Sequence, residues 1–159
     1  MELIKSGVIV FTGTEEICCP YCGGRLKVRG TCFRKLRTDD GTKLYRLRVM
    51  ECRECGKTHR ELPGNVVPYK RNDISRISAI AQATRENHLS AAETSTWKRI
   101  VIWCKWFLDY ARCIIDSLNE QNRDYCVGEP SGGFETRLSY LVRLVVNSGN
   151  WIQHRSVQT

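Results

Sequence analysis

Two short cysteine pairs carry the clearest chemistry in this 159-residue sequence. Cys19 and Cys22 form the first pair, Cys52 and Cys55 form the second, and a Gly directly follows each pair. A Cys-x-x-Cys turn points both thiolates to the same side, and the Gly allows the left-handed backbone that keeps amides near the sulfurs. Two such turns complete a tetrahedron, which predicts one structural Zn²⁺ held by four cysteines. Iron in the same ligand set is the chemical alternative.

Further thiols and one imidazole lie near these pairs or in segments with core patterning. Cys18 directly precedes Cys19 and competes with it as a ligand, but the tighter turn favours Cys19. His59 follows the second pair closely enough to contact a ligand or to replace one. The other thiols fit roles as small buried hydrophobes: Cys32, Cys104 and Cys113.

Positive charge is concentrated in the segment that the cysteine pairs bracket. The chain has a formal net charge of +8, and residues 25–71 hold fourteen Lys or Arg against five Asp or Glu. Four thiolates on a divalent ion remove about two of these charges, so the segment stays basic with metal bound. A polyanion is the expected partner, and the prediction is duplex DNA. The alternative is that the basic residues serve solubility alone.

Alternating side chains predict a hairpin between the cysteine pairs. Residues 25–29 and 44–49 alternate basic with apolar side chains, and residues 38–41 supply the turn. Arg46 and Arg48 should share one face, opposite the apolar residues, and the apolar run 7–11 should add an edge strand. The nucleic-acid contacts expected in this region are Arg34, Lys35, Arg37, Lys43, Arg46, Arg48, Lys70 and Arg71.

The rest of the chain has helical patterning, so the predicted fold class is α+β. Two prolines and a Gly in residues 62–71 place a boundary between a zinc ribbon, 1–71, and a helical domain, 72–159. Asn72 or Asp73 caps a first short helix.

The longest apolar stripe predicts a helix over about 94–120. Ser90 and Glu93 fit a capping box for its start. A further helix at about 134–147 should fold back over the stripe as a helical hairpin. A homodimer formed through the same stripe is the alternative.

The start of this long helix is similar to the second helix of a helix-turn-helix. Ser95 and Thr96 are small hydroxyl residues that reach phosphates or base edges in such a motif, and Lys98 and Arg99 add backbone contacts. The alternative is an ordinary capped helix with solvated basic side chains.

Several function classes are disfavoured. Charged residues interrupt every apolar run before the roughly 20 residues that a membrane span needs. The N-terminus has no secretory pattern, so we expect a soluble cytoplasmic protein with reduced thiols. Zinc with four cysteine ligands has no open position for water, and the carboxylates are scattered, which argues against an enzyme. A nucleophile–base pair of Cys126 and His154 is a weak alternative.

The motifs occur in an order that carries a resemblance. They are Cys19-Pro-x-Cys-Gly, Cys52-x-x-Cys-Gly-Lys-Thr-His59, Leu62-Pro63, Val67-Pro-Tyr-Lys-Arg71, Ser95-Thr96 and Trp151-Ile-Gln-His-Arg-Ser156. In this the chain resembles a bacterial family of zinc-ribbon proteins of unknown function, often associated with transposons. The resemblance implies a ribbon, a helix-turn-helix-like region and a link to mobile DNA, and it brings no established activity.

The charge and the resemblance together predict a function. We expect a zinc-dependent, non-catalytic DNA-binding protein, an accessory or regulatory factor of a bacterial mobile element. A transposition or regulatory protein is a further expected partner. The alternative is a zinc-stapled protein-interaction adaptor that does not read DNA directly.

Overall fold

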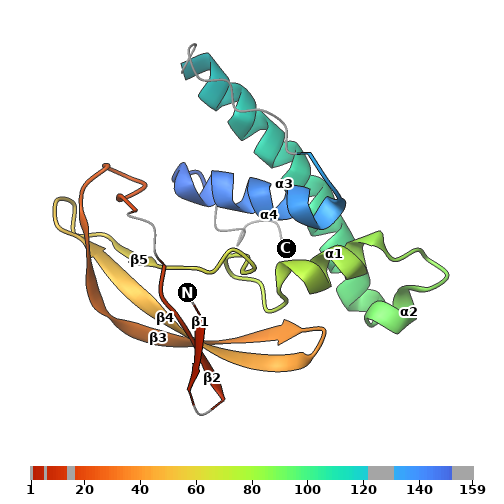
Figure 1. Ribbon diagram of the computed structural model, residues 1–159. Helices are drawn as coiled ribbons and strands as arrows, with labels where there is room; N and C mark the ends of the chain where they lie inside the picture. The colour runs from red at the N-terminus through yellow and green to blue at the C-terminus, as the bar shows by residue number, and fades with distance from the viewer. Residues whose placement is uncertain (1, 6, 14–16, 122–130, 152–159) are drawn as a thin grey trace. The chain divides into compact units, whose positions relative to one another are not determined.

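An α+β architecture, as predicted, is seen in the computed structural model, which describes residues 2–5, 7–13, 17–121 and 131–151 (Figure 1). Over these ranges, five strands precede four helices. The chain divides into two compact units, Met1–Asp73 and Ile74–Thr159. The first unit holds the sheet and the second holds the helices.

A long twisted hairpin forms the centre of the first unit (Figure 1). Strand β3 (Leu26–Thr38) pairs antiparallel with β4 (Gly41–Cys52) along nearly its whole length. Two residues, Asp39 and Asp40, make the turn, and Gly41 follows with φ of 112°. Only glycine adopts that backbone angle without strain, which explains why the chain reverses at the predicted position.

The other strands extend the sheet from β4. Strand β2 (Val8–Phe11) runs parallel to the first half of β4, which confirms that this run adds a strand to the sheet. It is not the edge strand, because β1 (Glu2–Lys5) pairs with its other side. Strand β5 (Thr58–Arg60) pairs with the last part of β4. The end of β4 therefore lies between strands on both sides, which holds the second cysteine pair in place.

The hairpin has one buried face and one exposed face. Tyr45 and Leu47 are buried and Arg46 between them is exposed, as the alternation predicted. The buried face packs against the extended segment that follows β5, where Val66 and Val67 are buried. Residues of the core cluster, with those packed against it, are Leu36, Tyr45, Leu47, Val66, Ile9, Phe11, Cys32 and Leu62.

Three helices share the core of the second unit. Helix α1 (Ile74–Gln82) packs against both α3 (Thr94–Gln121) and α4 (Phe134–Asn147), and a single turn, α2 (His88–Ala91), precedes α3. Each helix contributes buried apolar residues, which include Ile74, Ile77, Ile80, Trp103, Phe107, Ala111, Leu138, Val142 and Val145. Within the described ranges, the helices are too short or too polar to span a bilayer.

The contacts that stabilise the start of α3 differ from the predicted capping box. Ser90 lies inside α2 and its hydroxyl donates to the Asn87 carbonyl, so the capping box predicted with Glu93 is wrong. Instead, His88 Nε2 lies 2.9 Å from the Thr94 hydroxyl at the first residue of α3. The buried imidazole also stacks on Trp97, at 4.5 Å between ring centroids. An aromatic pair and a hydrogen bond thus replace the expected side-chain cap.

Candidate metal centre

The two cysteine pairs form turns of the same geometry. In the first, the Gly23 amide donates to the Cys19 carbonyl at 2.8 Å, and in the second the Gly56 amide donates to the Cys52 carbonyl at 3.1 Å. Both glycines are left-handed, with φ of 71° and 69°. A side chain with a Cβ would be strained there, so each Gly is needed to close its turn.

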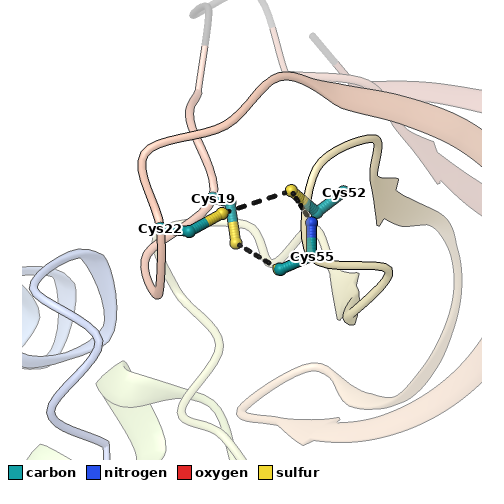
Figure 2. A group of neighbouring side chains, drawn as sticks. All are labelled: Cys19, Cys22, Cys52 and Cys55. Carbon is teal, nitrogen blue, oxygen red and sulfur yellow. Dashed lines mark hydrogen bonds between the residues drawn. The ribbon is translucent and has the colours of Figure 1, made fainter.

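The four sulfurs converge between these turns (Figure 2). All four lie within 4.8 Å of one another, with 3.6 Å between Cys19 and Cys55 and 3.5 Å between Cys22 and Cys52. A tetrahedral ion with zinc–sulfur bonds of about 2.3 Å separates its ligands by about 3.8 Å. The cluster therefore fits a tetrahedral metal such as zinc, and the structure brings together the four cysteines predicted as ligands.

The surroundings of the cysteines shift the pKa values of Cys19 and Cys52 in opposite directions. Burial opposes ionisation of Cys19, but the amides of Tyr21 and Cys22 outweigh it and lower the pKa of Cys19 to about 6. The Cys55 amide favours the thiolate of Cys52, yet burial and the neighbouring thiols raise the pKa of Cys52 to about 12. Adjacent sulfurs resist simultaneous ionisation because their charges repel, and a divalent cation removes that repulsion.

His59 is the neighbour of this cluster that the sequence singled out. Its Nε2 lies 3.4 Å from the Cys19 sulfur, and its ring lies 5.7 Å from that of Tyr21, centroid to centroid. Lys57 places its ammonium 3.7 Å from the centre of the same tyrosine ring. An imidazole N–H directed at a thiolate stabilises the bound form of a metal site. Cys18 lies outside the cluster. Its side chain is exposed, and its backbone pairs with that of Arg25 in an isolated β-bridge.

The expected nucleic-acid contacts of the first unit differ in exposure, and Lys70 is half-buried. Lys35, Arg37, Arg46 and Arg71 are exposed, and Lys43 pairs with Asp40 at 2.9 Å. Arg34 is half-buried and donates to the carbonyls of Val67 and Lys70, so it fastens the extended segment to the sheet. Burial and the nearby Arg60 charge lower the pKa of Arg34.

Arg48 lies on the same side of β4 as Arg46, but its charge is already matched. Its Nε and Nη2 donate to the two carboxylate oxygens of Glu61 at 2.6 and 2.5 Å, and Nη2 also reaches the Gly13 carbonyl. The Glu61 side chain is 6% exposed. This bidentate pair is part of the internal framework and leaves Arg48 little free charge for a polyanion.

The Arg48–Glu61 pair makes stability depend on pH. Burial alone would raise the pKa of Glu61, but hydrogen bonds from Arg48 and Gly13 lower it. A carboxyl with a lowered pKa stabilises the fold above its unfolded pKa of about 4.3, and this contribution disappears as the pH falls through the folded value. We expect Glu61→Gln to reduce the free energy of unfolding by about 2 kcal/mol near neutral pH, and the difference from the wild type to shrink below about pH 4.

Asp40→Asn is the control because it removes an exposed ion pair with Lys43 and should change stability by less than about 1 kcal/mol. Chemical denaturation of both variants and the wild type gives the difference at each pH. Acid also weakens metal binding in all three proteins, so the difference is the informative quantity. A difference for Glu61→Gln that stays constant into the acid range would contradict the assignment.

The expected contacts of the second unit lie at the start of α3. Ser95, Lys98 and Arg99 are exposed and Thr96 is half-buried. The preceding α2 has four residues, so the element before α3 is one turn rather than a full helix. The helix-turn-helix stays a prediction. Cys126 and His154 lie outside the described residues.

These features define a class: an α+β protein whose N-terminal sheet carries a four-cysteine cluster suited to zinc. The chain belongs to the family described as Domain of unknown function (DUF6431), which matches residues 19–100, just over half of its length. Comparisons with curated proteins and with solved structures gave no match. The resemblance to a family of unknown function with a four-cysteine cluster is therefore confirmed. The transposon association stays a prediction.

Proposed function

We propose that this protein is a zinc-dependent, non-catalytic DNA-binding protein. One Zn²⁺ held by the four cysteines would link the start of β3 to the end of β4. This link would stiffen the strands that carry the basic residues. A fully thiolate-ligated zinc offers no position for substrate or water, so its role would be structural. The resemblance adds the proposal that the DNA belongs to a mobile element and that the protein acts there as an accessory or regulatory factor.

The observation that supports this proposal is a group of unmatched cations on the exposed face of the hairpin. Lys35, Arg37 and Arg46 alternate with buried residues along β3 and β4 and therefore point to the same side, which we call the cationic face. Among the described residues, carboxylates pair with Lys27, Arg29, Lys43 and Arg48, and none pairs with these three side chains. Free cations on a firm surface are suited to phosphates.

Binding to duplex DNA should weaken steeply with salt, because each neutralised phosphate releases counterions. With Lys35, Arg37 and Arg46 all replaced by alanine, we expect the slope of log K against log salt to fall by about three. Fluorescence anisotropy of a labelled random duplex at several salt concentrations measures both quantities.

Lys43→Ala is the matched control, since its ammonium already pairs with Asp40. Lys98→Ala with Arg99→Ala tests the contribution of α3. A chelator-treated sample should lose binding together with its metal. Absence of duplex binding at low salt, or an unchanged slope in the triple variant, would overturn duplex DNA as the partner of the cationic face.

A protein-interaction adaptor is the second candidate. It is favoured by two large apolar side chains exposed in the helical unit, Leu89 at 71% and Ile102 at 67%. The same binding experiment separates the two functions. An adaptor would keep its protein complex when the cationic face is neutralised and lose it when Ile102 and Leu89 are replaced.

A further inference from the structure

An aromatic side chain lies in the middle of the cationic face. Phe33 is 64% exposed, although it sits within a long, regularly paired strand. Its cross-strand partner is Arg46, and Lys35 lies two residues along on the same side of β3. Cross-strand partners hold their Cβ atoms about 5 Å apart, and residues two apart in a strand are about 7 Å apart.

The position of Arg46 beside Phe33 is supported by a hydrogen bond. Arg46 Nε donates to the Thr31 hydroxyl at 3.2 Å, which fixes the guanidinium beside the aromatic side chain. On the buried side of the same strand, Leu36 and Cys32 pack in the core cluster, so the backbone beneath the ring is firm. A ring that stays exposed on folding gains no hydrophobic stabilisation, and a partner that covers it would supply that gain.

We infer that Phe33 is a stacking platform for an unpaired nucleobase, with Arg46 and Lys35 binding the phosphates on either side of that base. This inference rests on the proposed nucleic-acid function and names the form of nucleic acid that the cationic face takes, a single strand. In a duplex the faces of the bases are covered by their neighbours, so a ring on the face of a sheet reaches only the backbone and the groove edges. In a single strand the base faces are free, and an aromatic ring flanked by cations matches both the base and its phosphates.

The test compares single-stranded and duplex oligonucleotides of about 12 nucleotides, since single-strand sites span about 4–16 nucleotides. The probes are labelled oligo-dT, labelled oligo-rU and a random duplex, each titrated by anisotropy with the zinc-loaded full chain. We expect the wild type to bind a single strand more tightly than the duplex. Phe33→Ala should weaken single-strand binding at least about fivefold and leave duplex binding nearly unchanged. Phe33→Trp should retain single-strand binding because the larger ring also stacks.

Val28→Ala is the matched control. Val28 is an exposed apolar residue of the same strand, 53% exposed, but a bulge between Val28 and Gly30 separates it from the register of Phe33. Zinc content and far-ultraviolet circular dichroism confirm that each variant is folded. The DNA and RNA arms show which backbone the site accepts, and Phe33-dependent binding of either one supports the inference.

The outcomes distinguish this inference from the function on which it rests. If Phe33→Ala leaves single-strand binding intact while neutralising Lys35, Arg37 and Arg46 abolishes it, the platform is overturned and the cationic face stands. Equal loss of duplex and single-strand binding in Phe33→Ala also overturns it, because stacking on a paired base is excluded. No salt-sensitive binding to any probe overturns both proposals.

Discussion

Replacing Cys52 with alanine is expected to abolish metal binding and unfold the sheet unit. Cys52 is 2% exposed and ends the central strand, and its sulfur lies 3.5 Å from that of Cys22. Three remaining thiolates leave an open position and lose the closed tetrahedron. Structural zinc sites contribute about 10–16 kcal/mol of apparent binding free energy, which is as large as the whole stability of a typical domain, about 5–15 kcal/mol. We expect one Zn²⁺ per wild-type chain and much less than one in the variant.

Two exposed thiols provide the controls for this result. Cys18→Ala tests the cysteine next to the first pair, and Cys113→Ala tests a thiol of the helical unit. Both should keep one zinc per chain and the wild-type circular dichroism spectrum. Metal analysis, together with cobalt substitution to detect thiolate ligation, reads out each protein. Full zinc content in Cys52→Ala, or its loss in Cys18→Ala, would show that the ligand set differs from the four cysteines.

Replacing Phe107 with alanine is expected to destabilise the helical unit by about 3–5 kcal/mol. Phe107 is 1% exposed and stacks on Trp103 at 5.1 Å between ring centroids, so the truncation leaves a cavity at the centre of the three-helix core. The four tryptophans lie at positions 97, 103, 106 and 151, all in this unit. Tryptophan fluorescence during denaturation therefore follows the helical unit and not the sheet unit.

Ile102→Ala is the matched control on the same helix. Ile102 is 67% exposed, so its truncation removes little buried surface and should change the free energy of unfolding by less than about 0.5 kcal/mol. A similar loss of stability in both variants would mean that a second chain covers the exposed side of α3, a face different from the apolar stripe considered above for a homodimer. A concentration-dependent midpoint would separate that case from a monomer.

Local patterns were enough to predict much of the fold. Alternation placed Tyr45 and Leu47 inside and Arg46 outside, because a strand turns successive side chains to opposite faces. The two-residue turn before Gly41 and the apolar stripe of α3 followed from equally local chemistry. The failed capping box shows the limit of such reasoning. A serine hydroxyl can also bond the backbone of its own turn, and Ser90 does so within α2 instead of capping α3.

Contacts between residues that are far apart in the sequence could not be predicted from its local patterns. Arg48 and Arg46 have the same local pattern, yet Glu61 neutralises Arg48 because β5 returns along β4 and brings the carboxylate beside it. Arg34 likewise bonds the carbonyls of a segment more than thirty residues away. No periodicity encodes such pairings, because they depend on which strands meet. The exposure of Phe33 was also hidden, since a phenylalanine in a strand is more often buried than exposed.

The sequence by itself determined the candidate metal ligands, because the spacing within each Cys-x-x-Cys-Gly turn directs its two sulfurs to the same side. It also determined the basic character of the segment between the turns, since charge depends on composition alone. Only the tertiary structure decided which of those charges are free. Pairing across strands uses Arg48 and Arg34 within the fold and leaves Lys35, Arg37 and Arg46 beside Phe33 on an exposed face, and availability for a partner depends on that arrangement.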